Sequence, residues 1–446
     1  MPKEVIPMAT QTTRKLFGTD GVRGEAGTFL TAELATAIGR ATTASLEAQR
    51  PQVLIVRDTR ESGPMLEAAL AAGVAAAGGD ALLGGVLPTP AAAILVKRLG
   101  LDLAAVVSAS HNPFQDNGIK FFSGQGTKLG DEVEARIESL IAEPAADAPV
   151  GRVRELNGGL DDYLRELDSA FQLDLSGRRI VLDCAHGATY HAAPAIFKRL
   201  GAEVETIGDE PDGRNINAGC GSTHMDLLRE RVVASGADLG FAFDGDGDRV
   251  LAVDGSGRVH DGDELIALAA RGRAARGELR GGVVVTVMTN FGFHNAMEEA
   301  GIEVAVTQVG DRYVIDEMLR REWLLGGEQS GHIIASDFVA TGDGIAAALM
   351  TMRELGDGSL ADAVPMEKLP QTLVNVAVAD REAIADAAVV WDAVERENEA
   401  LAGRGRVLLR PSGTEPLVRV MVEAPSAGEA EAVCGRLVGL VRDELA

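Results

Sequence analysis

The sequence predicts an α/β protein in which three similar α/β domains precede a smaller C-terminal α+β domain. Short runs of β-branched residues alternate with Ala- and Leu-rich helical stretches, as in βαβ units. A polar loop and a helix follow such a run three times, in VLIVRDTR, RIVLDCAHG and VVVTVMTN. The length of 446 residues also fits three or four domains.

The expected elements follow in order along the chain. The first cycle predicts alternating strands and helices at 53–56, 64–78, 81–86, 90–99 and 103–107. The second predicts the same alternation at 180–182, 190–200, 203–207, 225–235 and 239–243. The third predicts it at 283–287, 293–300, 303–307, 312–321 and 323–325. After Pro365 we expect an antiparallel sheet with strands at 373–378, 407–409 and 417–423, a helix at 383–401 and a final helix.

A Pro- and Ala-rich stretch at 142–151 is a candidate linker. We therefore expect domains at 1–155, 156–257, 258–368 and 369–446.

The composition excludes several classes of protein. The 42 basic and 67 acidic residues give a net charge of −25, which disfavours binding to nucleic acids or anionic membranes. Three distant cysteines without a CxxC pattern form neither a disulfide framework nor a zinc site. Without a membrane-spanning apolar run or a signal-peptide core, we expect a soluble cytoplasmic protein. A phosphorylated substrate would need a local basic cluster.

Three aspartates follow the apolar run at 239–243. Asp244, Asp246 and Asp248 alternate with glycines, which let the backbone turn each carboxylate inward. A cation relieves their repulsion, and oxygen ligands favour Mg²⁺ or Ca²⁺. Arg249 and Gly255 stand where an EF-hand needs Gly and Glu. We predict a Mg²⁺ site with room for a substrate oxygen, the alternative being a solvated acidic turn.

A second polar segment, SASHNP at 108–113, follows the buried strand at 103–107. Such a place lies at the ligand-binding edge of an α/β sheet. Ser110 is a candidate nucleophile or phosphoryl carrier, and turn formation ahead of Pro113 is the alternative. Lys120 could bring positive charge to a transferring phosphoryl group, or be solvated.

Two further loops suit a sugar phosphate. In RPSGTEP at 410–416, two arginines (Arg410 and the following Arg419) and two hydroxyls could point at one phosphate dianion. The Gly-rich GGEQSGH at 326–332 suits hydrogen bonding to vicinal sugar hydroxyls. Each could also be an ordinary polar turn.

Together these motifs resemble the α-D-phosphohexomutase family. Five occur in order over essentially the whole chain: FGTDGVRG at 17–24, SASHNP at 108–113, DGDGDR at 244–249, GGEQSGH at 326–332 and RPSGTEP at 410–416. FGTDGVRG, Gln329 and VGDRYV at 309–314 are similar to the bacterial branch that acts on glucosamine phosphates. The phosphoglucomutase/phosphomannomutase branch is the alternative.

The resemblance implies four domains, with mixed sheets between helices, around a central cleft. Ser110 would carry the phosphoryl group and bind one Mg²⁺ together with Asp244, Asp246 and Asp248. Sugar hydroxyls would be held by Glu328 and Ser330. The non-reacting phosphate would be held by Arg410, Ser412, Gly413, Thr414 and Arg419.

The implied reaction interconverts glucosamine 6-phosphate and glucosamine 1-phosphate through glucosamine 1,6-bisphosphate, which feeds amino-sugar nucleotide and cell-wall precursor synthesis. Lys120 and Arg249 would neutralise charge on the transferring group. The general acid/base stays open among His111, Lys120 and His332. The family also implies a homodimer.

Two other classes compete with a mutase. A serine hydrolase built on Ser110 lacks the G-x-S-x-G elbow. A non-enzymatic protein that binds Ca²⁺ or a sugar phosphate is disfavoured for calcium by the failed EF-hand register.

Overall fold

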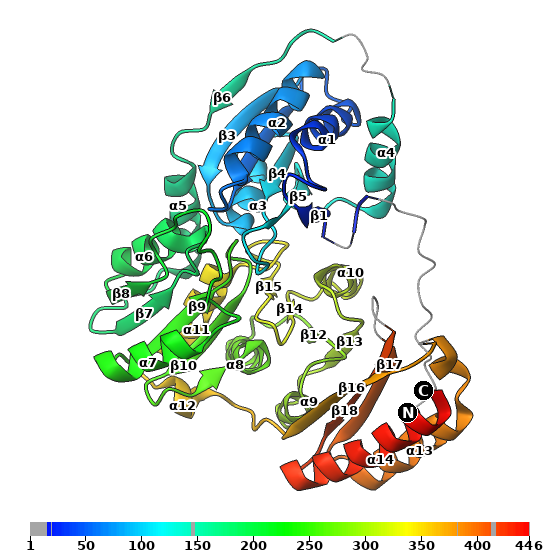
Figure 1. The fold of residues 1–446 in the computed structure, drawn as a ribbon. Helices are drawn as coiled ribbons and strands as arrows, with labels where there is room; N and C mark the ends of the chain where they lie inside the picture. The colour runs from blue at the N-terminus through cyan, green and yellow to red at the C-terminus, as the bar shows by residue number, and fades with distance from the viewer. Residues whose placement is uncertain (1–15, 19, 144–147, 381, 412–415, 446) are drawn as a thin grey trace. The chain divides into compact units, whose positions relative to one another are not determined.

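The structure is a computed structural model that describes residues 16–18, 20–143, 148–380, 382–411 and 416–445 (Figure 1). The chain forms two compact units. The first contains Met1–Val287 and Ala305–Val364, and the second contains Met288–Val304 and Pro365–Ala446. None of the described helices is long and apolar enough to cross a lipid bilayer.

The first sheet has six strands in the order β1-β5-β4-β2-β3-β6. They are β1 (Val22–Glu25), β2 (Gln52–Arg57), β3 (Asp80–Val86), β4 (Leu103–Val107), β5 (Asp116–Ser123) and β6 (Val153–Glu155). The helices of this part of the chain are α1 (Ala32–Ala44), α2 (Gly63–Ala76), α3 (Thr89–Arg98), α4 (Asp131–Ile141) and α5 (Gly159–Phe171).

Strand alternation divides the core of this sheet between two helix layers. Val53 and Ile55 of β2 share one apolar cluster with residues of α1, α2 and α4. The neighbouring Leu54 and Val56 are equally buried and point to the opposite face. Because α3 contacts β2, β4 and β5, the first sheet lies between helices (Figure 1).

The second and third sheets are smaller. The second, in the order β11-β10-β9-β7-β8, contains β7 (Arg179–Asp183), β8 (Glu203–Ile207), β9 (Leu239–Phe243), β10 (Val250–Asp254) and β11 (Val259–His260). The third, in the order β13-β12-β14-β15, contains β12 (Val283–Thr286), β13 (Val304–Thr307), β14 (Leu325–Gly327) and β15 (Ile333–Ala335). The other helices of the first unit are α6 (Thr189–Arg199), α7 (Asp226–Ser235), α8 (Gly262–Ala275), α10 (Asp311–Arg321), α11 (Gly344–Leu355) and α12 (Leu360–Ala363).

The three sheets share one four-strand arrangement. It reads β3-β2-β4-β5 in the first sheet, β8-β7-β9-β10 in the second and β13-β12-β14-β15 in the third. The last strand of each set is antiparallel to its neighbour. The loops that enter these antiparallel strands are 108–115, 244–249 and 328–332. Three motifs singled out in the sequence therefore occupy equivalent places.

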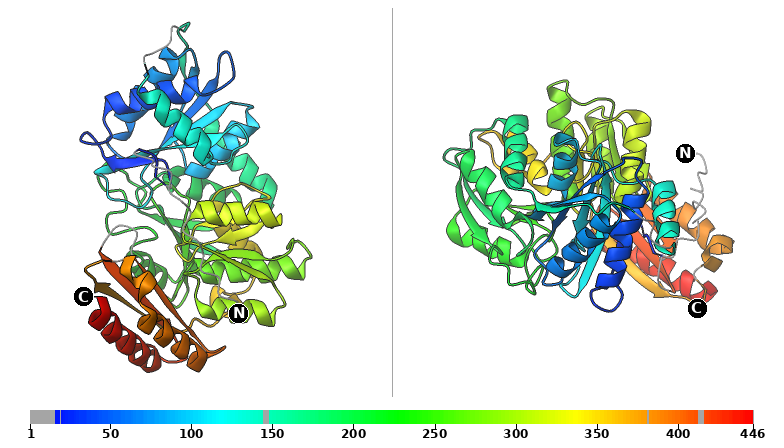
Figure 2. Two further views of the ribbon diagram at one scale, coloured as in Figure 1. Left: turned by 90° about the vertical axis from the view of Figure 1, so that its right-hand side faces the viewer. Right: turned by 90° about the horizontal axis from the view of Figure 1, so that it is seen from above.

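The second unit contains a three-stranded antiparallel sheet in the order β16-β18-β17. Its elements are α9 (Phe291–Glu299), β16 (Gln371–Ala377), η1 (Glu382–Asp386), α13 (Ala388–Leu401), β17 (Arg406–Pro411), β18 (Leu417–Glu423) and α14 (Ala427–Leu445). Val418, Val420 and Val422 of β18 pack in one apolar cluster with α13 and α14, so both helices cover one face of the sheet (Figure 2). The expected C-terminal α+β domain is confirmed.

Two expected elements were wrong in extent. The helix expected at 383–401 is divided into η1 and α13, because Ala387 between them has a non-helical ψ of 72°. The Trp391 indole N–H donates to the Ile384 carbonyl oxygen (2.8 Å) across this break. The strand expected at 323–325 is instead β14, Leu325–Gly327. It extends through the two glycines because Gly326 and Gly327 pair with Ile334 and Ile333 of β15. Ladder pairing overrides the low strand propensity of glycine there.

Candidate active site

Ser110 lies in the loop that leaves β4 and is only 1% exposed. Its backbone has a φ of 52°, in the left-handed region that non-glycine residues rarely adopt. Its N–H donates to Ser108 Oγ (2.9 Å), whose hydroxyl donates to Asp58 (2.6 Å). Strained conformations of this kind persist where the surrounding structure enforces them, and they gather at functional sites.

Two side chains hold the Ser110 carbonyl. Arg60 Nη2 and Asn217 Nδ2 each donate to it at 2.9 Å. Both also donate to the Asn112 carbonyl, at 2.9 and 3.1 Å. Arg60 is fully buried and forms an ion pair with the equally buried Asp58 (2.8 Å). The loop therefore has a rigid frame.

Asp244, Asp246 and Asp248 form a buried cluster at the end of β9. Each offers a carboxylate oxygen within 4.8 Å of the others. Gly245 is required by close packing, because a Cβ there would lie 2.5 Å from the Ser110 carbonyl oxygen. Burial and the charges of Asp248 and Asp246 raise the pKa of Asp244 well above its usual value.

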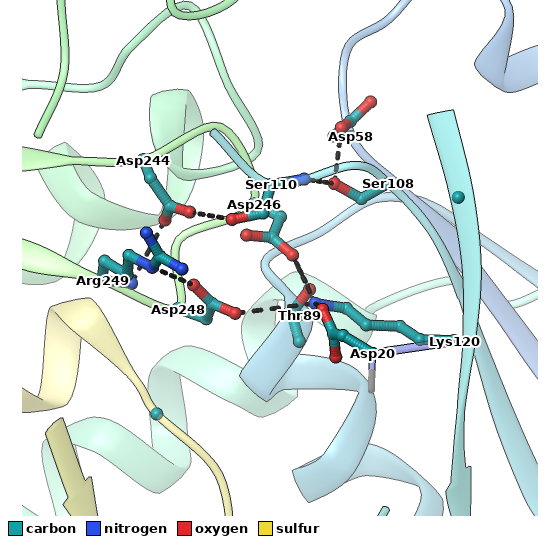
Figure 3. A network of polar contacts seen from close by, with 12 residues as sticks. Asp20, Asp58, Thr89, Ser108, Ser110, Lys120, Asp244, Asp246, Asp248 and Arg249 are labelled. Carbon is teal, nitrogen blue, oxygen red and sulfur yellow. Dashed lines mark hydrogen bonds and ion pairs between the residues drawn. The ribbon is translucent and has the colours of Figure 1, made fainter. Parts of the chain in front are cut away.

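The aspartate cluster meets the Ser110 loop directly. The Ser110 hydroxyl donates to Asp244 Oδ2 at 2.5 Å (Figure 3). On the other side, Lys120 of β5 donates to Asp246 Oδ2 at 2.6 Å and lies 3.6 Å from Asp248. Burial disfavours the charge on Lys120, but the carboxylates of Asp246, Asp20 and Asp248 outweigh it and raise the pKa of its ammonium group. Lys120 is thus a fixed cation beside the cluster.

The donor set fits a hard divalent cation. Asp246 Oδ1 and Asp248 Oδ1 are buried and have no hydrogen-bond partner among the described residues. A buried carboxylate oxygen without a hydrogen bond destabilises the fold unless a cation coordinates it. Three carboxylates without sulfur or imidazole suit Mg²⁺, which keeps further positions for phosphate oxygens. The residues present therefore fit the expected ion.

The other candidate catalytic residues surround this cluster. His111 Nδ1 lies 3.3 Å from Ser110 Oγ, and burial together with Arg249 and Arg23 lowers the pKa of its ring to about 4. Arg249 donates its backbone N–H to Asp244 (3.2 Å). His332 Nδ1 lies 3.7 Å from Asp248 Oδ2.

The expected sugar-binding loop begins directly after β14. Glu328 Oε1 accepts the Gly310 N–H at 2.9 Å, and Glu328 is half-buried. Ser330 is exposed. The loop closes on itself through the Glu328 N–H, which donates to the His332 carbonyl at 3.0 Å.

The expected phosphate-binding residues lie in the second unit. Arg410 of β17 and Arg419 of β18 are cross-strand partners. Burial and the nearby Arg419 lower the pKa of Arg410. Ser412, Gly413 and Thr414 lie outside the described residues.

Several residues of the site were not singled out from the sequence. Thr89, at the start of α3, donates to Asp246 Oδ2 at 2.6 Å. Asp20 pairs with Arg23 and lies 3.9 Å from Lys120. Asp20 and Arg23 belong to the FGTDGVRG motif, which was a usable signal. No sequence signal marks Arg60, Thr89 and Asn217, because each contacts a residue that lies 50 to 157 positions away in the sequence.

Known proteins with related sequences share this architecture. Family models for phosphoglucomutase/phosphomannomutase match in chain order: α/β/α domain I at 14–147, domain II at 161–257, domain III at 261–369 and the C-terminal domain at 373–440.

Full-length relatives and a solved structure agree with these matches. Phosphoglucosamine mutase from Pelotomaculum thermopropionicum is 51% identical, covering 96% of this chain and 99% of that protein. The enzyme of the same name from Streptomyces coelicolor is 50% identical, covering 97% and 99%. A crystal structure of a phosphoglucomutase/phosphomannomutase family protein from Burkholderia thailandensis superposes with a TM-score of 0.80 at 25% identity, covering 96% of this chain and 97% of that one. The chain therefore belongs to the phosphoglucomutase/phosphomannomutase family, the α-D-phosphohexomutases.

Proposed function

We propose that the protein is an isomerase that interconverts glucosamine 6-phosphate and glucosamine 1-phosphate. The observation that carries the reaction type is the 2.5 Å contact between the Ser110 hydroxyl and Asp244 in a buried carboxylate cluster. The choice of glucosamine is supported by the names of relatives that are about half identical over almost their whole length.

Ser110 would carry the phosphoryl group between turnovers. Asp244, Asp246 and Asp248, with an oxygen of the phosphoserine, would hold one Mg²⁺. When bound, the ion would neutralise charge on the phosphoryl oxygens. This assignment is supported by the buried Oδ1 atoms of Asp246 and Asp248, which have no hydrogen-bond partner among the described residues.

The first half-reaction transfers the phosphoryl group from Ser110 Oγ to the C1 hydroxyl of glucosamine 6-phosphate. The bond between phosphorus and Ser110 Oγ breaks, and a bond between phosphorus and the sugar oxygen forms. A general base takes the hydroxyl proton, and the Ser110 oxygen ends protonated. Lys120 and Arg249 stabilise charge on the group in transit. His111, Lys120 and His332 are the candidates for the general acid/base. The His111 ring lies 3.3 Å from Ser110 Oγ, which favours it for the proton of the Ser110 oxygen.

The product of that step would be glucosamine 1,6-bisphosphate. It must turn end over end, so that its 6-phosphate faces Ser110 and returns the enzyme to the phosphorylated state. Glu328 and Ser330 would hold sugar hydroxyls in both orientations. Arg410 and Arg419, with Ser412, Gly413 and Thr414, would hold the phosphate that does not react.

The assembly and domain limits form part of the same proposal. We expect a homodimer, which light scattering of the purified protein tests. We also expect domains at 1–155, 156–257, 258–368 and 369–446 to carry the phosphoserine, the metal, the sugar loop and the phosphate loop, respectively.

A competition assay tests the proposed substrate. Initial rates with glucosamine 6-phosphate, glucose 6-phosphate and mannose 6-phosphate give three values of kcat/KM. We expect glucosamine 6-phosphate to exceed the neutral sugars by at least about tenfold. Equal or better rates on glucose or mannose phosphate would replace the glucosamine assignment with a phosphoglucomutase/phosphomannomutase.

A further inference from the structure

Lys128 is a partly buried cation outside the catalytic machinery described above. It lies in the loop after β5, and its side chain is 13% exposed. Its ammonium group forms ion pairs with Asp20 Oδ1 and with Asp311 Oδ2. Burial disfavours its charge, but Asp20 and Asp311 raise the pKa of the ammonium group above its usual value. One ammonium group therefore joins two carboxylates that belong to different parts of the first unit.

The Asp20 end of this bridge leads to the phosphoryl-transfer groups. Asp20 Oδ2 pairs with Arg23 and lies 3.9 Å from Lys120 Nζ. Lys120 in turn donates to Asp246 at 2.6 Å. Asp20 is thus one charged residue away from the aspartate cluster.

The Asp311 end leads to the sugar loop. Asp311 is the first residue of α10, and the preceding Gly310 donates its N–H to Glu328 Oε1 at 2.9 Å. Gly310 has a φ of 131°, which favours glycine at this position. Asp311 Oδ2 also lies 3.7 Å from His332 Nε2, at the other end of the same loop. Both ends of the loop 328–332 therefore contact residues 310 and 311.

A second link joins the same two segments. Arg312 Nη2 donates to Glu134 Oε2 (3.0 Å) and to the Leu129 carbonyl (3.3 Å). The chain after β5 is thus fixed to the N-terminus of α10 by two cations, one supplied by each side. Two opposed links define an orientation where a single link would define only a distance.

We propose that Lys128 is a positioning residue that sets the sugar loop 328–332 at the correct distance from Ser110 and its aspartate cluster. The Lys128 ammonium group can pair with both carboxylates at once only while the two segments stay in place. Displacement of a substrate by about 1 Å can lower a rate about 100-fold. The inference rests on the proposed function in one respect, namely that loop 328–332 binds the sugar.

The test compares Lys128→Met, Lys128→Arg and the matched control Lys97→Met, an exposed lysine on α3. We expect Lys128→Met to lower kcat/KM for glucosamine 6-phosphate by about 10- to 100-fold through a raised KM and a lowered kcat. Lys128→Arg, which keeps the charge, should restore part of that loss. The phosphate content of Ser110, measured by mass spectrometry, and the Mg²⁺ affinity, measured by calorimetry, should match the wild type.

Hydrogen exchange provides a readout that needs no substrate. Lys128→Met should raise amide exchange in peptides that cover 308–314 and 328–332, and Lys97→Met should not. Asp311→Asn should give the same kinetic defect, and the double variant should be no worse than either single one. A variant that only lowers thermal stability, with wild-type kinetics and exchange in these peptides, overturns the proposal. A wild-type protein inactive on glucosamine 6-phosphate instead refutes the proposed function, and the exchange experiment still decides the role of Lys128.

Discussion

The hydroxyl of Ser110 donates to the carboxylate of Asp244 at 2.5 Å, although 134 positions separate the two residues in the sequence. Ser110 follows β4 of the first sheet, and Asp244 follows β9 of the second. Both loops precede an antiparallel strand in equivalent positions of their sheets. The repeated strand arrangement therefore places the Ser110 hydroxyl from one sheet against the aspartate cluster from the next.

Removal of that hydroxyl tests its role as phosphoryl carrier. Ser110→Ala should lower kcat by at least about 1000-fold, because no other described hydroxyl donates to Asp244. Mass spectrometry of a digest of the purified wild-type protein should find one phosphoryl group on the peptide that contains Ser110. Ser139→Ala, on the surface of α4, should behave as the wild type. Full activity in Ser110→Ala would exclude the phosphoserine.

Neutralising one aspartate of the cluster should weaken metal binding. Asp248→Asn leaves two carboxylates, and we expect the Mg²⁺ dissociation constant to rise by at least about 100-fold in calorimetric titration. Asp226→Asn, a 92% exposed residue of α7, is the matched control. An unchanged titration curve for Asp248→Asn would argue that the ion binds elsewhere.

The buried ion pair between Arg60 and Asp58 should contribute to both stability and activity. Arg60→Met leaves the buried Asp58 carboxylate unpaired and removes the donor to the Ser110 carbonyl. Breaking a buried pair in this way typically lowers the free energy of unfolding by about 3–5 kcal/mol. Urea unfolding of the full-length protein measures the effect on stability, and the turnover rate measures the effect on activity.

A surface pair provides the control for that experiment. Arg165→Met removes the pair with Asp162, in which Arg165 is 59% exposed, and should change stability by less than about 1 kcal/mol. Equal effects of the two substitutions would show that Arg60 has no special structural role.

Asp343 should make stability depend on pH. It caps α11 by accepting the Ala346 N–H, and it accepts the Tyr163 hydroxyl. Burial raises the pKa of its carboxyl to about 7, because the hydrogen bonds that favour the charged form offset burial only in part. The native state therefore favours the protonated carboxyl. Its contribution to stability is complete below the unfolded pKa near 4 and is lost as the pH rises through about 7.

Asp343→Asn removes this titration and keeps a capping oxygen. Relative to the wild type, the variant should gain about 2–3 kcal/mol in free energy of unfolding between pH 5 and pH 8. Denaturant melts at the two pH values measure it, with the exposed Asp357→Asn as the control. A parallel pH dependence of wild type and Asp343→Asn would contradict the prediction.

Much of the fold follows from the sequence, because strand and helix periods are local properties. The strands at 103–107, 203–207, 239–243 and 417–423 agree with β4, β8, β9 and β18 residue for residue. No element was expected at 32–44 or 116–123, where α1 and β5 lie. β5 carries Lys120, and it is a strand because it pairs with β4 and β1 on either side.

The motifs of the site were also visible in the sequence, and their supporting contacts were not. FDGDGDR indicates a metal site because three carboxylates between glycines repel one another wherever they lie. By itself the sequence determined the order of the domains and the chemical groups that each loop offers. Only the tertiary structure decided that Arg60, Thr89 and Asn217 hold those groups. It also decided that Lys128 pairs with both Asp20 and Asp311. These contacts depend on distances in space between segments far apart along the chain, and no local pattern of residues encodes such distances.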